Sequence, residues 1–157
     1  MALTITLEPW ADVGGEILPL MREGFAETGM GDVRRSFDLE ISQVASDAAQ
    51  GYLRTYVARD WGKPCGFMVW RVGWDPESRG LPVAQQVWWY AKPEAPFGCA
   101  VRLFEESVAS LRDIGIQAVF PHVRPRGRGA KMGRWLERRG ARPYAQTYIM
   151  WIGDGNE

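Results

Sequence analysis

The stretch Val87-Trp88-Trp89-Tyr90-Ala91-Lys92-Pro93-Glu94-Ala95-Pro96-Phe97-Gly98-Cys99-Ala100 runs from a predicted strand through a turn into a predicted helix. Residues 83–91 show little alternation of apolar and polar side chains, which is typical of a strand covered on both faces. Four apolar residues then lie at helical spacing: Val101, Phe104, Val108 and Leu111. Gly115 ends this helix, and residues 116–120 follow as another strand. Because a strand–helix–strand unit joins parallel strands, we expect residues 83–91 in the centre of a sheet.

The residues before this unit predict a strand, two helices and an antiparallel hairpin. Asp12 can cap the first helix, which tolerates Pro19 only in its first turn. In the second helix, Asp38 is the candidate N-cap and Gly51 the stop. The strands are expected at 3–7, 53–58 and 66–72.

The residues after this unit predict a Gly- and Arg-rich loop, a helix at 132–139 and a last strand at 146–152. The whole order is typical of a mixed α/β sheet with helices on its faces. The chain shows no internal repeat and no linker. We therefore predict a single domain over 1–157, in which 1–92 carries the N-terminal strand, two helices and the antiparallel strands, and 93–157 the helix that follows the turn after residue 92 and the later elements.

Composition favours a globular cytoplasmic protein. Hydrophobic residues make up 46% and charged residues 24% of the chain. No apolar run approaches the roughly 18 residues of a membrane span, and the first residues lack the basic region and apolar core of a signal peptide. Cys65 and Cys99 lack the spacing of zinc ligands, so we expect reduced thiols and no metal site.

Basic residues gather in the segment 124–142. This segment holds eight basic side chains and one acidic side chain, Glu137, which gives a local charge of +7 and leaves −7 elsewhere. It could be a solvated face, or it could bind the phosphates of a small ligand, an acidic protein partner or nucleic acid. Nucleic acid ranks last because the chain shows no nucleic-acid-binding motif.

Two short stretches, in addition to the order of the helices and strands, indicate the family to which the chain is similar. Residues 88–94 resemble the fourth strand and Pro-Glu turn of the GNAT acyl-CoA N-acyltransferases, and residues 135–141 resemble their late helix with its glycine stop. The resemblance covers nearly the whole chain, and it implies transfer of an acetyl group from acetyl-CoA to an amine on a small molecule or a protein. Residues 119–124 and the following helix resemble GNAT-like proteins encoded by bacteriophages, some of which are virion proteins. The alternative function is therefore a catalytically inactive GNAT-fold protein that binds virion components or another partner through 124–142.

The resemblance places the cofactor's pyrophosphate at residues 95–100. The family pattern there is Gln or Arg, two residues, Gly, one residue, then Gly or Ala. Gly98 and Ala100 match it, and the expected cofactor-binding residues are Phe97, Gly98, Cys99 and Ala100. Small residues let backbone N–H groups at a helix N-terminus approach phosphate. Ala95 departs from the pattern, Pro96 offers no N–H, and Phe97 is bulky.

A second stretch also fits the literal pattern. Residues 124–129 read Arg-Pro-Arg-Gly-Arg-Gly and precede a helix. If they formed the cofactor loop, only one strand would remain after it, so we prefer 95–100. We then expect Arg126 and Arg128 near the edge of the cofactor groove, where they could contact phosphates.

Acyl transfer to an amine requires a polarised thioester carbonyl, a base and an acid. The resemblance implies that backbone N–H groups of Tyr90 and Ala91 meet the carbonyl. The family's tyrosine acid lies four residues before the stop glycine, where this chain has Leu136. Tyr144 and Tyr148 are substitutes, or ordinary core residues.

His122 is the candidate base, because it follows a strand at the end where ligands gather in open α/β sheets and because imidazole side chains commonly act as general bases. It could equally be a hydrogen-bonded loop residue. Glu40, Glu77 and Glu94 could act through water. The tryptophans of the middle strands could line an acceptor pocket or form the core: Trp70, Trp74, Trp88 and Trp89.

Overall fold

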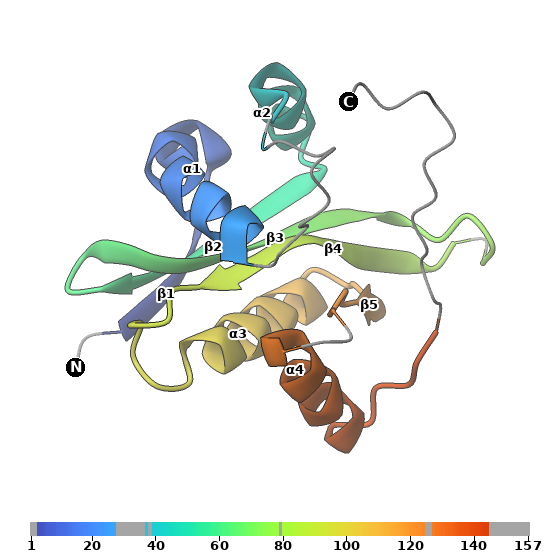
Figure 1. The fold of residues 1–157 in the computed structure, drawn as a ribbon. Coiled ribbons are helices and arrows are strands. Elements are labelled where there is room, and N and C mark those ends of the chain that lie inside the picture. Colours follow the sequence, from blue (N-terminus) through green and yellow to red (C-terminus); the bar gives the residue numbers. More distant parts are fainter. Residues whose placement is uncertain (1–2, 28–36, 38, 79, 125–126, 145–157) are drawn as a thin grey trace, which may run out of the picture. The chain divides into compact units, whose positions relative to one another are not determined.

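Five strands form one mixed sheet in the order β1-β2-β3-β4-β5 in the computed structural model of the protein (Figure 1). The structure describes residues 3–27, 37, 39–78, 80–124 and 127–144. The chain forms two compact units, Met1–Phe120 and Pro121–Glu157. The first unit contains β1 (Leu3–Glu8), α1 (Trp10–Glu27), α2 (Ile41–Ala49), β2 (Leu53–Asp60), β3 (Lys63–Trp74), β4 (Pro82–Ala91), α3 (Cys99–Asp113) and β5 (Ala118–Phe120), and the second contains α4 (Gly127–Arg138).

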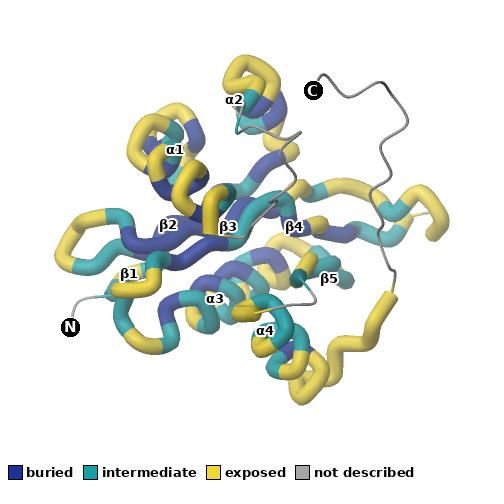
Figure 2. Tube along the Cα trace, in the orientation of Figure 1, coloured by how far each residue is buried: buried dark blue, intermediate teal, exposed yellow. Residues whose placement is uncertain are grey.

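The sheet of the first unit separates two hydrophobic cores. Helices α1 and α2 cover one face and α3 covers the other, and buried residues gather where these layers meet (Figures 1 and 2). Strands β1 to β4 pair antiparallel, whereas β4 and β5 pair parallel. The predicted α/β class, the hairpin of β2 and β3, and the parallel pair around α3 are therefore confirmed. No described helix is long and apolar enough to cross a membrane.

Helix α1 differs from the prediction in where it begins and in where Pro19 lies within it. It begins at Trp10 instead of after Asp12, and Pro19 lies inside it instead of in its first turn. Proline has no N–H, so the helical hydrogen bond from residue 19 to the carbonyl of Gly15 is missing. Gly15 is exposed, so water can hydrogen-bond to this carbonyl instead. Ile17 and Leu20, on either side of Pro19, are buried against the sheet, and this packing outweighs the local disruption.

Other boundaries also moved. Helix α2 begins after Glu40, and Asp38 lies outside the described residues. Strand β5 begins at Ala118, two residues later than predicted. Helix α4 begins at Gly127, so part of the predicted basic loop is helical. The predicted last strand at 146–152 lies outside the described residues.

The buried face of α3 is not the one that its apolar spacing predicts. The residues buried there are Cys99, Leu103, Ser107 and Leu111, whereas Val101, Phe104 and Val108 are half-buried. Ser107 belongs to this face because its hydroxyl accepts a hydrogen bond from the indole Nε1 of Trp70, at 2.9 Å. A polar residue takes a core position, and the predicted stripe is rotated about the helix axis.

Two glycines of α1 are expected to respond in opposite directions to alanine. An alanine Cβ at Gly15 would meet nothing within 4 Å, whereas one at Gly24 would lie 2.9 Å from Cγ of the Tyr90 ring. Gly15→Ala should raise the free energy of unfolding by about 0.5–1 kcal/mol through helix propensity. Gly24→Ala should lower it by about 1–2 kcal/mol, because overpacking exceeds the same gain. Urea unfolding of the two variants measures both, and a stabilised Gly24→Ala would contradict the tight contact.

Candidate functional site

Strand β4 carries a bulge at Val87. Its register with β3 pairs Val69 with Trp88 and Trp70 with Gln86, so Val87 is an extra residue. As a result Val87 and Trp88 both pack on the core beneath α1 and α2. The alternation then resumes, with Trp89 on the α3 face and Tyr90 on the α1 face.

Beyond the bulge, one edge of β4 pairs with no described strand. Strand β5 pairs with β4 only from Val83 to Gln85, and no other described strand continues on that edge. The amide of Lys92 donates to the carbonyl of Cys65 on β3, at 2.9 Å. Antiparallel ladders alternate, so the amide of Tyr90 also faces β3, whereas those of Trp89 and Ala91 face the open edge. Of the two amides expected from the sequence, only that of Ala91 faces outward, and sequence reasoning missed Trp89.

The two outward residues form a short, regular row of hydrogen-bonding groups. At about 3.3 Å per residue, the amides of Trp89 and Ala91 lie about 7 Å apart, each with a carbonyl on the same edge. An open edge of this kind can pair with any extended molecule that carries amides.

The turn after β4 leads directly into the N-terminus of α3. The amide of Cys99 donates to the carbonyl of Pro96, at 3.0 Å, which fixes a tight turn around Phe97 and Gly98. Gly98 precedes the helix at φ 81°, a left-handed conformation that favours glycine. The next amides of the first turn, including that of Ala100, have no acceptor within the helix. Phe97 is fully exposed, so its ring does not fill the space at the helix end.

Trp89 brings an unsatisfied donor to this region. Its ring stacks on Phe104 of α3, with ring centroids 5.4 Å apart. Its Nε1 is buried and has no hydrogen-bond partner among the described residues. A buried donor without an acceptor is unfavourable, which is consistent with a polar group arriving from a ligand.

Cys65 and Cys99 lie in contact beneath the turn. Their Sγ atoms are 4.0 Å apart, and both are free thiols. Burial raises the pKa of both thiols, that of Cys99 to about 12. At neutral pH both therefore remain protonated, and they pack α3 onto β3 instead of acting as nucleophiles.

On the opposite face of β4, Tyr90 contacts a carboxylate of α1 that sequence reasoning missed. The hydroxyl of Tyr90 donates to Oε1 of Glu27, the last residue of α1, at 3.3 Å. Nearby, Nζ of Lys92 lies 3.6 Å from Glu23 and 3.8 Å from Glu94. The sequence signal that could have indicated Glu27 is an acidic residue in the last turn of a helix, where acidic residues are disfavoured.

The remaining predicted residues belong to the second unit or are not among the described residues. His122, Arg128 and Tyr144 are exposed and belong to the second unit, in which the predicted acid position, Leu136, is buried. Arg126 and Tyr148 lie outside the described residues.

The acidic and tryptophan candidates differ in how far they are buried and in which face of the sheet they occupy. Glu40, Glu77 and Glu94 are all exposed. Trp70 is completely buried and belongs to the core, whereas Trp74 is 70% exposed. Trp88 and Trp89 are half-buried on opposite faces of β4.

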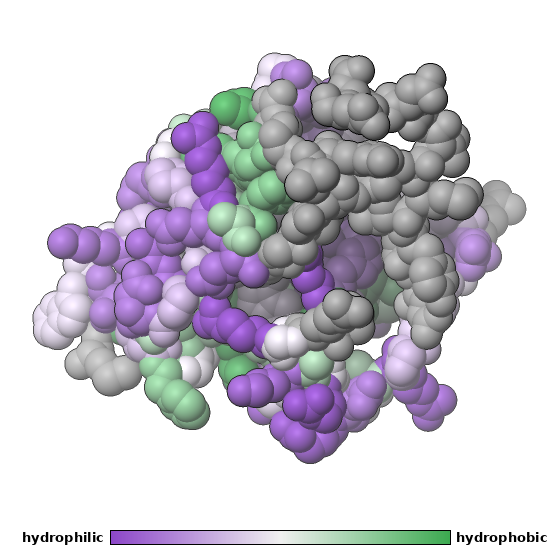
Figure 3. Space-filling view, in the orientation of Figure 1, coloured by the Kyte–Doolittle hydropathy of each residue, from purple (hydrophilic) through white to green (hydrophobic). Residues whose placement is uncertain are grey.

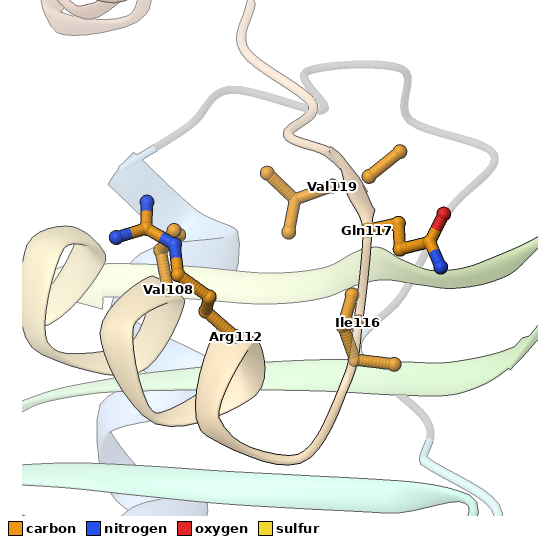
Figure 4. Close-up of a pocket in the computed structure, with 6 residues that line it drawn as sticks. Val108, Arg112, Ile116, Gln117 and Val119 are labelled. Atoms are coloured by element: carbon orange, nitrogen blue, oxygen red, sulfur yellow. The ribbon is translucent and has the colours of Figure 1, made fainter.

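A small pocket lies at the far end of α3. Figure 4 shows Val108 and Arg112 on the helix beside the segment that carries Ile116, Gln117 and Val119, and the pocket encloses about 200 Å³. Its first lining residue, Val108, lies ten residues after Gly98, about 15 Å along the helix at about 1.5 Å per residue. The pocket is below the usual size of a ligand site, about 300–1,000 Å³, and is separate from the β4–α3 turn.

Comparisons with solved structures identify the fold. The chain matches an aminoglycoside acetyltransferase from an uncultured soil metagenomic sample with a TM-score of 0.73 and 14% identity, over 98% of this chain and 100% of that one. It matches a ribosomal-protein-alanine N-acetyltransferase from Brucella melitensis biovar Abortus 2308 with a TM-score of 0.66 and 19% identity, over 97% and 100%. A predicted acetyltransferase from Clostridium acetobutylicum, solved with acetyl-CoA, matches with a TM-score of 0.67 and 11% identity, over 96% of each chain.

These matches are structural. No protein-family model matches the sequence, and no curated protein matches it by sequence. The chain has the fold of the GNAT acetyltransferases.

Proposed function

We propose that the protein is a GNAT-type acyltransferase that moves an acetyl group from acetyl-CoA to an amine. The observation that carries the proposal is the β4–α3 unit, in which a strand edge that pairs with no described strand leads into a helix N-terminus whose amides after Cys99 have no acceptor within the first turn. The fold is shared with acetyltransferases, one of them solved with acetyl-CoA, which supports the same cofactor here.

The residues present fit acetyl-CoA. The outward backbone amides of Trp89 and Ala91 can pair with the amide groups of the pantetheine arm. The indole N–H of Trp89 is a further hydrogen-bond donor, which has no acceptor among the described residues. The first-turn amides of α3, with the helix dipole, suit the phosphates, and the exposed ring of Phe97 leaves room for them. When bound, acetyl-CoA would supply an acetyl group activated as a thioester.

For proton transfer, His122, which lies two residues after the end of β5 in the chain, stays the candidate base, and Tyr144 and Tyr148 stay candidate acids. Arg126 and Arg128 stay candidate contacts for the cofactor's phosphates.

Calorimetric titration with acetyl-CoA tests the cofactor site. The wild type should bind with a micromolar Kd, and Phe97→Asp should weaken binding at least about tenfold, because a carboxylate beside the helix N-terminus repels phosphate (about 1.4 kcal/mol). Phe97→Asp removes no buried surface and places an acidic group where the helix dipole favours it, so stability should not fall.

Two variants control for the charge and for the ring. Ser42→Asp adds the same charge to the first turn of α2 and should bind acetyl-CoA like the wild type. Phe97→Ala removes the ring without adding charge and should bind within about threefold of the wild type. If the wild type gives no heat and no thermal stabilisation at millimolar acetyl-CoA, the enzyme proposal fails. The alternative, a non-catalytic protein that binds a partner through 124–142, would then stand.

A further inference from the structure

Strand β1 lies at one edge of the described sheet, beside β2 only, and it lacks the features that usually protect an edge (Figure 1). Proteins block outer strands with lysine, proline, bulges or very short strands. Strand β1 has six residues, Leu-Thr-Ile-Thr-Leu-Glu, and pairs with β2 without a register shift. Its one charged residue, Glu8, lies at its end and pairs with Arg59. By contrast, β5 at the other edge of the described sheet has only three residues.

The pairing of β2 determines which backbone groups of β1 point outward. On the far side of β2, the carbonyl of Tyr52 accepts a hydrogen bond from the amide of Val72 of β3, at 2.8 Å. Because backbone groups alternate along a strand, the even-numbered residues of β2 face β3 and the odd-numbered residues face β1. The register shift between β2 and β3 does not change this alternation, because the extra residue, Cys65, belongs to β3.

The outward row of β1 consists of the amides and carbonyls of Leu3, Ile5 and Leu7. The even-numbered residues of β1 pair with the odd-numbered residues of β2, so the odd-numbered residues of β1 point away from the sheet. Consistent with this direction, Nη1 of Arg102 donates to the carbonyl of Leu3, at 3.3 Å. The backbone groups of Ile5 and Leu7 have no hydrogen-bond partner within the described part of the chain. They are therefore available to pair with another strand.

This row is complementary to a second copy of itself. If two β1 strands run antiparallel about a two-fold axis at Ile5, then Ile5 lies opposite Ile5 of the second copy and Leu3 lies opposite Leu7. Each of these pairs exchanges both of its backbone hydrogen bonds. The same register places Thr4 opposite Thr6, and threonine pairs of this kind stabilise adjacent strands. Like charges directly opposite each other, which would destabilise the pairing, do not occur between Leu3 and Leu7.

Leu7 is the aliphatic residue of this row that the single chain leaves most exposed. Its side chain lies on the α3 side of the sheet, because it pairs with Tyr56 of that core. Leu3 and Ile5 are partly buried against the same core, whereas Leu7 is 47% exposed. Leu3 of the second copy would cover it, and burial of apolar surface is favourable. Figure 3 shows mostly hydrophilic side chains at the end of the molecule where Figure 1 places β1 and the β2–β3 hairpin, so we expect backbone pairing to provide most of the affinity.

We propose that the β1 edge binds the β1 edge of a second copy of this chain, antiparallel and with Ile5 on the two-fold axis. The two sheets then form one continuous sheet. The partner is a second copy because the row reads the same in both directions about Ile5, in its outward backbone groups and in its side chains. The inference does not rest on the proposed function, since β2 and β3 separate β1 from the candidate site on β4.

Amide hydrogen exchange, followed by NMR on the full-length protein at about 50 μM and about 1 mM, tests this pairing residue by residue. The amides of Ile5 and Leu7 should exchange at least about threefold more slowly at the higher concentration, because they are paired only in the dimer. The amides of Thr4 and Thr6 pair with β2 in the single chain and should already exchange slowly at the lower concentration. The outward amide of Trp89, on the edge of β4, should not respond to protein concentration.

Sedimentation velocity of Leu7→Lys tests the same edge through a side chain. The variant should raise the Kd of the dimer at least about tenfold, because pairing would bury an ammonium group against Leu3 of the second copy. Leu7 is exposed in the single chain, so the variant should fold, and slow exchange of the Thr4 and Thr6 amides checks this. The matched control is Ile41→Lys, the same type of replacement at a position of α2 that is 49% exposed, which should dimerise like the wild type.

Three results would overturn the proposal. The first is a wild type that stays monomeric at about 1 mM, a concentration at which even weak pairing is populated. The second is a Leu7→Lys variant that dimerises with the Kd of the wild type. The third is a dimer in which the amides of Ile5 and Leu7 exchange at the same rate at both concentrations, because its interface would then lie away from β1.

Discussion

Trp70→Ala is expected to lower the free energy of unfolding by about 3–5 kcal/mol, the largest change of any single substitution considered for this protein. The indole is completely buried, and its ring centroid lies 6.1 Å from that of Phe104. Its Nε1 donates to the hydroxyl of Ser107, at 2.9 Å, which ties β3 to α3. Alanine would leave a cavity in the core, and the Ser107 hydroxyl, which also donates to the carbonyl of Phe104 at 3.0 Å, would lose the hydrogen bond that it accepts from the indole. Urea unfolding followed by circular dichroism measures the difference.

Trp74→Ala is the matched control for this prediction. It removes the same side chain from the same strand, at a position that is 70% exposed. We expect a change within about 0.5 kcal/mol, as for most surface substitutions. Similar losses in the two variants would show that burial at Trp70 does not determine the effect.

Arg59→Ala is expected to destabilise the protein by about 2 kcal/mol at neutral pH, the second-largest effect. The Arg59 guanidinium donates to both carboxylate oxygens of Glu8, at 2.9 and 2.8 Å, and so joins β2 to β1. It also donates to Glu16 of α1 and, at 3.1 Å, to the carbonyl of Gly62 in the hairpin turn. Glu16 is exposed, so we attribute most of the loss to Glu8 and Gly62.

Lowering the pH should reduce the difference in unfolding free energy between the wild type and Arg59→Ala. The hydrogen bond from Arg59 lowers the pKa of Glu8 below the ordinary value of 4.5. A lowered pKa in the folded state contributes stability above 4.5, which is lost as the pH falls through the lower folded-state value. Wild type and Arg59→Ala should therefore converge in unfolding free energy on acidification.

The test is urea unfolding of both proteins between neutral pH and about one unit below the Glu8 reference value. Arg102→Ala, which removes an exposed pair within α3, should differ little from the wild type at every pH. A gap between Arg59→Ala and the wild type that stays constant with pH would exclude the Glu8 contribution.

The order of elements could be predicted because each depends on its own residues. Periodicity and turn residues located the hairpin and the parallel pair on either side of α3. The predictions failed where the burial or position of a residue depends on residues far away in the sequence. Ser107 is buried because Trp70, 37 residues away, needs an acceptor, and Pro19 is tolerated inside α1 because the sheet holds its neighbours.

The candidate site was predictable to the same degree. Gly98 was located from its place in a pattern, and its left-handed backbone gives the physical reason for a glycine there. The direction of each amide in β4 depends on the register with β3, which local sequence does not contain. Glu27 and Tyr90 are 63 residues apart and meet only in the folded protein.

The bulge at Val87 also determines how β4 should be aligned with any related strand that lacks the extra residue. A one-residue gap placed at Val87 would keep Trp89 opposite Met68 and Tyr90 opposite Phe67, with each side chain on its present face. A gap placed a few positions later would exchange the faces of Trp88, Trp89 and Tyr90, because the side-chain period of a strand is two. At identities of 11–19%, the position of this gap decides which residues of the site are compared.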